Sequence, residues 1–139
     1  MRDVILPKQE LEKLGVAAVY LFGSRAEGMA GKLSDFDVAV LFRDPAIARA
    51  NTNELYNKLY DIFSDTFDAS GFKNIDIVFL ERAPLELQFD VIRHGKILCE
   101  ISRDIRTDFE HRTAMLYFDF KPLLEYFNEQ VLAKVWVNR

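Results

Sequence analysis

The sequence predicts a single α/β domain of the α+β kind: a small mixed sheet with flanking helices, followed by a long C-terminal helical segment. Three observations lead to this prediction. Short apolar runs of strand character alternate with stretches of helical periodicity, as in α/β chains. The connection between the first two predicted strands has only about a dozen residues, which is short for a parallel crossover and ample for an antiparallel or irregular return. Everything after Ser102 has helical character.

The composition of the 139 residues indicates one ordered domain with a substantial core. Half of the residues are hydrophobic, and no stretch is low in complexity. The net charge of −4 argues against a general nucleic-acid binder, which needs a basic face, so we expect no direct contact with nucleic acid. Cys99 is the only cysteine, which excludes a disulfide framework and a zinc cluster and makes Cys99 a candidate core residue.

The start of the chain and its apolar runs predict a cytoplasmic protein. Residues 1–3 lead into a segment interrupted by charges, unlike the apolar core of a signal peptide. The longest apolar runs fall short of the roughly 20 residues that a membrane-spanning helix needs. A lone cysteine fits a reducing compartment. We therefore expect a cytoplasmic location and no membrane partner.

The individual elements follow from periodicity and from their end signals. Asp44 and Pro45 are a typical helix start, with an N-cap followed by proline at the first helical position. The predicted elements, in order, are a helix over 8–14, strands over 16–22 and 35–42, a helix over 46–66, a strand over 74–80, a helix from Pro84 to Gly95, an edge strand over 96–100, and a helix after Ser102 that is bent or interrupted near Pro122.

Two aspartates open the second predicted strand. Asp35 and Asp37 share one face, because side chains two residues apart on a strand point the same way, and the apolar residues of this strand lie on the other face. Their α-carbons are roughly 7 Å apart, so both carboxylates can converge on a pair of metal ions of the kind that clamps an in-line phosphoryl displacement. Ligand sets made of oxygen alone favour Mg²⁺ over zinc.

A third aspartate, Asp76, lies in the predicted strand over 74–80. A carboxylate among β-branched residues is costly unless it has a role, and a strand beside that of Asp37 would let Asp76 complete the metal site or act as a base. An Asp-x-Asp alone is more often a turn or cap, and Asp76 alone could face solvent at a strand edge. The set of three acids in two strands favours a site for metal-assisted phosphoryl or nucleotidyl transfer.

The turn after the first strand supplies the phosphate-binding candidates. Gly23 would let the backbone approach a phosphate closely, and Ser24 offers a hydroxyl and a backbone N–H. Arg25 or Lys32 could add positive charge near a triphosphate, and nothing in the spacing selects between them. A Gly-Ser pair alone is an ordinary turn, so these assignments depend on the aspartates that follow.

Three stretches carry a family resemblance: LFGSRAEG, SDFDVAVLF and NIDIVFL. They resemble the minimal nucleotidyltransferase (MNT) family of the DNA polymerase β-like nucleotidyltransferase superfamily. The signature of that family is Gly-Ser, ten residues, then Asp-x-Asp, and Gly23-Ser24 and Asp35-Phe36-Asp37 meet it with the spacing intact. The resemblance continues through both later helical stretches and covers nearly the whole chain.

The resemblance implies a polymerase β-like fold and an activity. Similar proteins are antitoxins paired with HEPN-domain ribonuclease toxins, to which they transfer AMP from ATP, on a tyrosine hydroxyl. By this resemblance Asp35, Asp37 and Asp76 would be the catalytic, Mg²⁺-binding carboxylates, and Gly23 and Ser24 would hold the nucleotide phosphates. The expected partners are a HEPN toxin and ATP, with a hetero-oligomer between this chain and the toxin.

The last quarter of the sequence has more aromatic residues than one helix face can usually bury. They are Tyr117, Phe118, Phe120, Tyr126, Phe127 and Trp136. One face of this segment would pack on the sheet, and part of the set would meet a partner. We therefore expect one nucleotidyltransferase domain over 1–139, with a catalytic core over 1–101 and a partner-binding helical segment over 102–139.

Two other functions are compatible with the sequence. The chain could neutralise its partner by stoichiometric binding without catalysis, although a pure scaffold gains nothing from buried acids. It could also transfer a nucleotide to a small molecule, although 139 residues leave little room for the acceptor pocket that such enzymes add. Toxin inhibition without ATP would favour the first alternative.

Overall fold

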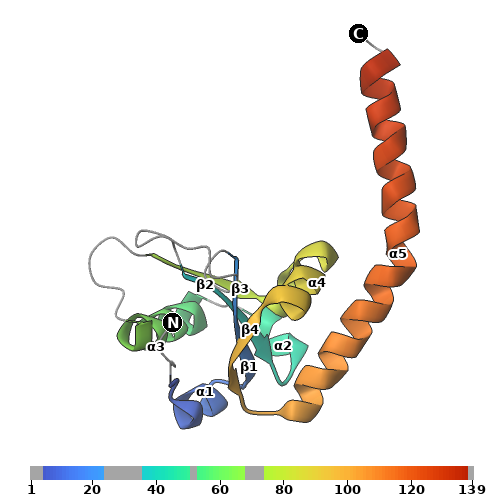
Figure 1. Ribbon diagram of the computed structural model, residues 1–139. Coiled ribbons are helices and arrows are strands. Elements are labelled where there is room, and N and C mark those ends of the chain that lie inside the picture. Colours follow the sequence, from blue (N-terminus) through green and yellow to red (C-terminus); the bar gives the residue numbers. More distant parts are fainter. Residues whose placement is uncertain (1–4, 24–35, 51–52, 68–73, 138–139) are drawn as a thin grey trace.

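A four-stranded mixed sheet forms the centre of the molecule, as Figure 1 shows for the computed structural model. The structure describes residues 5–23, 36–50, 53–67 and 74–137. The strands are β1 (Val16–Phe22), β2 (Phe36–Phe42), β3 (Ile75–Phe79) and β4 (Lys96–Glu100), and the helices are α1 (Lys8–Lys13), α2 (Pro45–Arg49), α3 (Asn53–Phe67), η2 (Leu80–Arg82), α4 (Leu85–His94) and α5 (Arg103–Val137). The predicted fold class is thereby confirmed.

The order of the strands is β3-β2-β1-β4. β1 pairs antiparallel with β2 and with β4, whereas β2 and β3 run parallel. The short connection after β1 therefore makes an antiparallel return, as its length predicts. The parallel pair requires a crossover, and α2 and α3 supply it. The prediction that residues 96–100 form an edge strand is confirmed.

The two faces of the sheet are covered differently. One face is wholly apolar and packs against α1 and α3, with Leu59 and Phe63 of α3 fully buried. Cys99 lies in this core, and burial raises the pKa of its thiol, which therefore stays protonated. The other face has smaller side chains, such as Ala18 and Ala39, and packs against α4 and the first part of α5.

One predicted helix is two helices in the structure. The prediction of a continuous helix over 46–66 was wrong, because Ala50 has extended backbone angles (φ −72°, ψ −178°) and separates α2 from α3. The start was predicted correctly: the carboxylate of Asp44 accepts a hydrogen bond from the Ala46 N–H at 2.9 Å, and Pro45 is the first helical residue. Ile47 and Leu55 reach the same core from separate helices.

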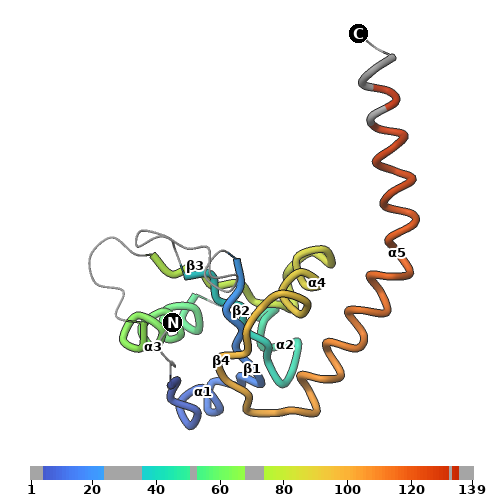
Figure 2. Tube along the Cα trace, viewed as in Figure 1, coloured from blue at the N-terminus to red at the C-terminus, as the bar shows by residue number. Residues whose placement is uncertain are grey.

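α5 is a single helix of 35 residues that continues through Pro122. An interruption near Pro122 was therefore not found, although Figure 1 shows that the helix changes direction along its length. A proline inside a helix removes one backbone hydrogen bond, which water replaces more easily where the helix is exposed. We call residues 103–117 proximal α5 and residues 118–137 distal α5. The chain trace in Figure 2 shows distal α5 rising away from the rest of the molecule.

A charged network fixes proximal α5 to the sheet. The Arg106 guanidinium donates to Glu100 of β4 at 2.7 Å and to Glu110, one turn further along α5, at 2.7 Å. The Arg106 side chain is only 14% exposed, so both carboxylates compensate a largely buried charge. Tyr20 of β1 lies beneath this network, and burial together with the nearby Glu110 charge raises the pKa of its phenol.

Many large apolar side chains of α5 are exposed, 43% or more of each: Met115, Leu116, Phe118, Phe120, Leu123, Tyr126, Phe127 and Val131. Tyr117 is half-buried and stacks on Phe89 of α4. The side chain of Trp136 lies outside the described part of the chain. None of the helices in the described ranges has the length and hydropathy that crossing a membrane requires.

Candidate active site

The structure brings three of the five predicted site residues together at one edge of the sheet. Asp37 of β2 pairs with Phe22 of β1 on one side and with Asp76 of β3 on the other. Gly23 follows Phe22 directly. The other two, Ser24 and Asp35, lie outside the described residues, as do both basic candidates, Arg25 and Lys32.

Asp37 and Asp76 share a face because parallel partners in register point the same way. Their α-carbons belong to neighbouring strands, which are about 4.8 Å apart. They lie on the face of Ala39 and Leu41, opposite to Val38 and the apolar core. The alternation of the strand over 35–42 thus sorts the described residues as predicted.

Gly23 is the residue that keeps this edge open. Its φ of +74° is in the left-handed region, which side chains other than glycine rarely adopt. A Cβ at this position would collide with the carboxylate of Asp37. The backbone of the turn therefore lies directly against an acid, and only a residue without a side chain fits there.

The two carboxylates differ in exposure. Asp37 is half-buried and Asp76 is exposed. Acids on adjacent strands repel one another unless a cation lies between them, so the pair fits a metal ion with oxygen ligands. Within the described residues no cluster of three or more possible metal ligands occurs. The third carboxylate of the predicted set is Asp35, outside those residues, so the two described acids would be part of the ligand set.

Two features of the sheet away from this edge were not predicted from the sequence. Arg106 and its carboxylate partners fix the helix that covers the aspartate face, and the spacing of Arg106 and Glu110 by four residues was a signal that could have indicated it. Glu81 accepts a hydrogen bond from the Phe42 N–H at 2.7 Å, at the opposite end of β2 from Asp37. No pattern in the sequence points to that contact.

A family profile described as "Polymerase beta, Nucleotidyltransferase" matches residues 7–104. The chain belongs to the polymerase β nucleotidyltransferase family. The matched range includes the whole sheet and ends at the start of α5. Its members are nucleotidyltransferases.

Solved structures with the same fold are toxin–antitoxin complexes. One, a toxin–antitoxin with AMP-PNP, is 25% identical with a TM-score of 0.66, over 91% of this chain and 99% of that chain. An MntA–HepT complex is 23% identical with a TM-score of 0.59, over 90% and 96%. A tri-AMPylated HEPN toxin in complex with an MNT antitoxin, from Shewanella oneidensis, is 22% identical with a TM-score of 0.61, over 90% and 95%.

The fold of this chain is therefore that of MNT antitoxins crystallised with HEPN toxins. The likeness extends over nearly all of both chains, so it includes α5 as well as the sheet. A search of curated proteins gives no match to the sequence.

Proposed function

We propose that this chain is a Mg²⁺-dependent protein adenylyltransferase that transfers AMP from ATP to a tyrosine hydroxyl of a HEPN ribonuclease toxin and so neutralises it. The observation that carries the proposal is that Gly23, Asp37 and Asp76 lie side by side at the same end of the sheet. Gly23 follows β1, Asp37 belongs to β2 and Asp76 belongs to β3. The similar structures with AMP-PNP and with a tri-AMPylated toxin support the choice of nucleotide and acceptor.

Each site residue is assigned a role, which position supports for Gly23, Asp37 and Asp76 and which the family resemblance implies for Ser24 and Asp35. Asp35, Asp37 and Asp76 would hold Mg²⁺, which when bound neutralises charge on the phosphates and on the attacking oxygen. Gly23 and Ser24 would hold the phosphates, because the left-handed turn at Gly23 leaves the backbone uncovered. The absence of a side chain at Gly23 also leaves the Asp37 carboxylate accessible from the turn.

The reaction is a single displacement at the α-phosphorus. The tyrosine oxygen forms a bond to that phosphorus while the bond from it to the oxygen bridging to the β-phosphorus breaks. Pyrophosphate leaves with the electron pair of the broken bond. The phenolic proton is accepted by a carboxylate, for which Asp76 is the exposed candidate at the sheet edge.

The part of α5 from Leu116 onward supplies a surface for the acceptor protein. Phe109 and Thr113 are buried against the domain, and the same spacing of three and four residues continues as Leu116, Phe120, Leu123 and Phe127, which are exposed. We call these last four residues the apolar face. A helix stripe that is buried in its first half and exposed in its second fits a binding surface for another protein. Docking of the acceptor on the apolar face would hold the acceptor hydroxyl near the α-phosphate.

The test uses ATP labelled at the α-phosphate, this chain, and a HEPN protein from the same organism as acceptor. Label is expected to reach the HEPN protein with the wild type and to fall by about a thousandfold or more with Asp37→Asn. Ser24→Ala is expected to reduce transfer as well. Asp61→Asn is the matched control, because Asp61 is an exposed aspartate on α3, which covers the opposite face.

Equal labelling by the wild type and Asp37→Asn would contradict the proposal. Neutralisation of the HEPN protein without ATP, undiminished in Asp37→Asn, would instead identify a stoichiometric antitoxin. Transfer of label to a small molecule but not to the protein would identify the other alternative.

A further inference from the structure

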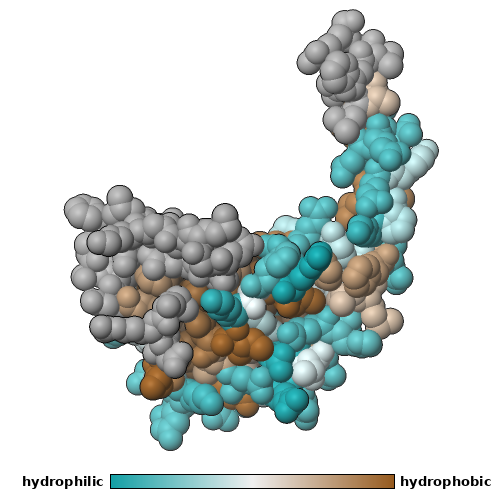
Figure 3. All heavy atoms as spheres, viewed as in Figure 1, coloured by the Kyte–Doolittle hydropathy of each residue, from teal (hydrophilic) through white to brown (hydrophobic). Residues whose placement is uncertain are grey.

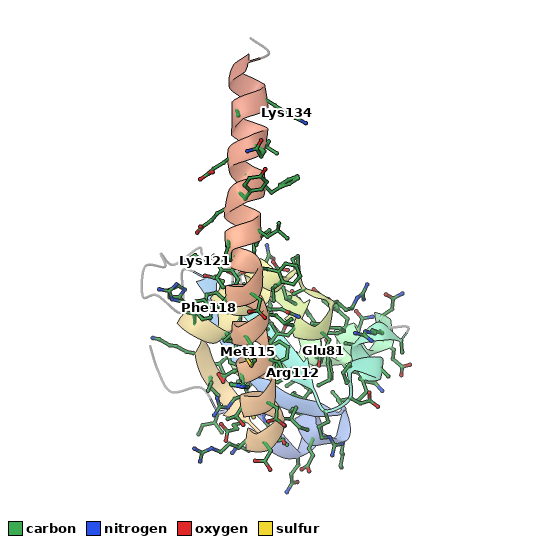
Figure 4. The ribbon with its side chains drawn as sticks, turned by 90° about the vertical axis from the view of Figure 1, so that its right-hand side faces the viewer. Glu81, Arg112, Met115, Phe118, Lys121 and Lys134 are labelled. Atoms are coloured by element: carbon green, nitrogen blue, oxygen red, sulfur yellow. The ribbon has the colours of Figure 1, made fainter. Side chains whose placement is uncertain are left out.

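A groove of about 710 Å³ lies between α4 and the middle of α5. It is separate from the edge that bears Asp37 and Asp76. Side chains of both helices line it, among them Phe89 and Arg93 of α4 and Glu110, His111, Phe118 and Lys121 of α5. Figure 4 shows Phe118 and Lys121 on the same side of α5.

Aromatic rings form one wall of the groove. Phe89 stacks on Tyr117 with ring centroids 3.8 Å apart, which fixes the Phe89 ring between the helices. Phe118 meets Phe89 edge to face at 5.5 Å, and 60% of the Phe118 residue surface is still exposed. One ring is therefore held by the fold while its neighbour remains open to a ligand.

The side chains that line the groove carry more positive than negative charge. Its acid, Glu110, is already engaged by Arg106. Arg93 lies over the Phe89 ring, 6.0 Å from its centroid. Neither Arg93 nor Lys121 forms an ion pair with any residue in the described ranges, and His111 adds a further basic group. This local excess of positive charge stands against a net charge of −4 for the whole chain.

The α4 end of the groove adjoins the catalytic edge. Arg93 is two residues before Gly95, and a Cβ on Gly95 would lie 3.3 Å from the Leu21 carbonyl oxygen. Leu21, which also pairs with Lys96, precedes Gly23 by two residues. The C-terminal end of α4, which carries Arg93, is therefore linked through Gly95 and Leu21 to the strand that leads into the proposed phosphate turn.

We propose that this groove binds an acidic segment of the acceptor protein and so selects the substrate of the transfer reaction. The inference rests on the proposed function for the identity of the acceptor. Two uncompensated cations beside an open aromatic ring fit carboxylates flanked by an apolar side chain. Nucleic acid would need a larger basic face than this acidic chain offers.

The groove and the apolar face can be altered independently. At about 100° per residue, the groove side chains of α5 centre roughly 160° around the helix from Leu116, Phe120, Leu123 and Phe127. Figure 3 shows hydrophilic residues over much of the side of distal α5 that faces the viewer. Substitutions in the groove therefore leave the apolar face intact.

The experiment compares Arg93→Glu combined with Lys121→Glu against Lys8→Glu combined with Lys13→Glu. The control makes the same change of charge at exposed positions on α1, which packs on the other face of the sheet. With the HEPN protein of the transfer assay as acceptor, the groove variant is expected to raise KM for the acceptor by about tenfold, with the effect on KM rather than kcat. Added salt is expected to raise KM of the wild type more steeply than KM of the variant.

Affinity for the HEPN protein, measured by calorimetry without nucleotide, separates the two proposals. A wild type that binds but transfers no AMP contradicts the proposed function, and a tenfold weaker affinity of the groove variant would still support the groove. A groove variant that matches the control in KM and in affinity, with an unchanged thermal midpoint, overturns the inference. If the groove variant loses binding to a single-stranded RNA that the wild type binds, while its affinity for the acceptor protein is unchanged, the groove is a nucleic-acid site and the inference is overturned.

Discussion

The two faces of the sheet divide stability and chemistry between them. On one face every strand contributes large apolar side chains, and Leu59 and Phe63 of α3 complete a dry core. On the other face β1 and β2 carry alanines at the centre and β2 and β3 carry Asp37 and Asp76 at one end. Small side chains let α4 and α5 lie close to this face, and the acids remain accessible at its end.

This difference shows that the position of a residue in the strand alternation decides whether its side chain enters the apolar core or the face that carries Asp37 and Asp76. Asp37 lies between Phe36 and Val38 in sequence but on the opposite side of the sheet from both. Substitutions in the apolar core should therefore change stability without changing catalysis, whereas only substitutions at the end that carries Asp37 and Asp76 should change catalysis. Three variants, in order of decreasing expected effect, test this separation.

Phe63→Ala should have the largest effect, and on stability alone. Phe63 is fully buried in the apolar core between α3 and the sheet. Removing a buried phenylalanine ring costs about 3–5 kcal/mol, so the free energy of unfolding measured in urea should fall by that amount. The rate of AMP transfer per folded molecule should stay within about twofold of the wild type. A loss of AMP transfer under conditions where all of the variant is folded would show that the two faces are not independent.

Gly23→Ala should reduce both quantities, and Gly15→Ala is its matched control. Both glycines have positive φ, 74° and 84°, so alanine is strained at either by about 1 kcal/mol or more. At Gly23 the new Cβ meets the Asp37 carboxylate, whereas at Gly15 it meets the end of the flexible Ile47 side chain. Both variants should lose about 1–2 kcal/mol of stability, and Gly23→Ala alone should lose transfer, by about tenfold to a hundredfold. Equal transfer by the two variants would separate the Gly23 turn from the site.

Glu81→Gln should have the smallest effect, visible only in the pH dependence of stability. Burial raises the pKa of Glu81 above its ordinary value of 4.5, despite the hydrogen bond from Phe42. A carboxyl group with a raised pKa in the folded state favours folding at low pH, and this contribution is lost as pH rises through the folded pKa. The wild type should therefore lose stability relative to Glu81→Gln as pH rises above the ordinary value of 4.5, measured as urea midpoints. A constant difference between the two proteins would show that Glu81 has an ordinary pKa.

Much of this fold could be predicted because its signals are local. The length of the connection after β1 predicted the antiparallel return, and the Asp44-Pro45 pair predicted the start of α2. The break at Ala50 was missed because the helix was predicted from its apolar residues alone, although the polar run Asn51-Thr52-Asn53 after Ala50 has the residue types that favour a new helix start. The continuity of α5 through Pro122 depends on how exposed the helix is there, which the sequence does not state.

The site divides in the same way. Alternation was enough to place Asp37 on the face away from the core, but its register with Asp76 depends on which strands are neighbours. That order is a property of the whole chain, and the family resemblance implied only that Asp76 would join Asp35 and Asp37. The groove between α4 and α5 was not predicted at all, since Arg93 and Lys121 become neighbours only through the packing of two helices.

The uncovered hydrophobic side chains along distal α5 bear on how the protein must be made. A copy synthesised without the HEPN partner that we propose exposes eight large apolar residues to water between Met115 and Val131. Such a copy invites self-association and proteolysis, which shortens its lifetime relative to a bound copy. Its abundance in the cell would then follow that of its partner, and balanced synthesis from one transcript would be the simplest means of keeping both.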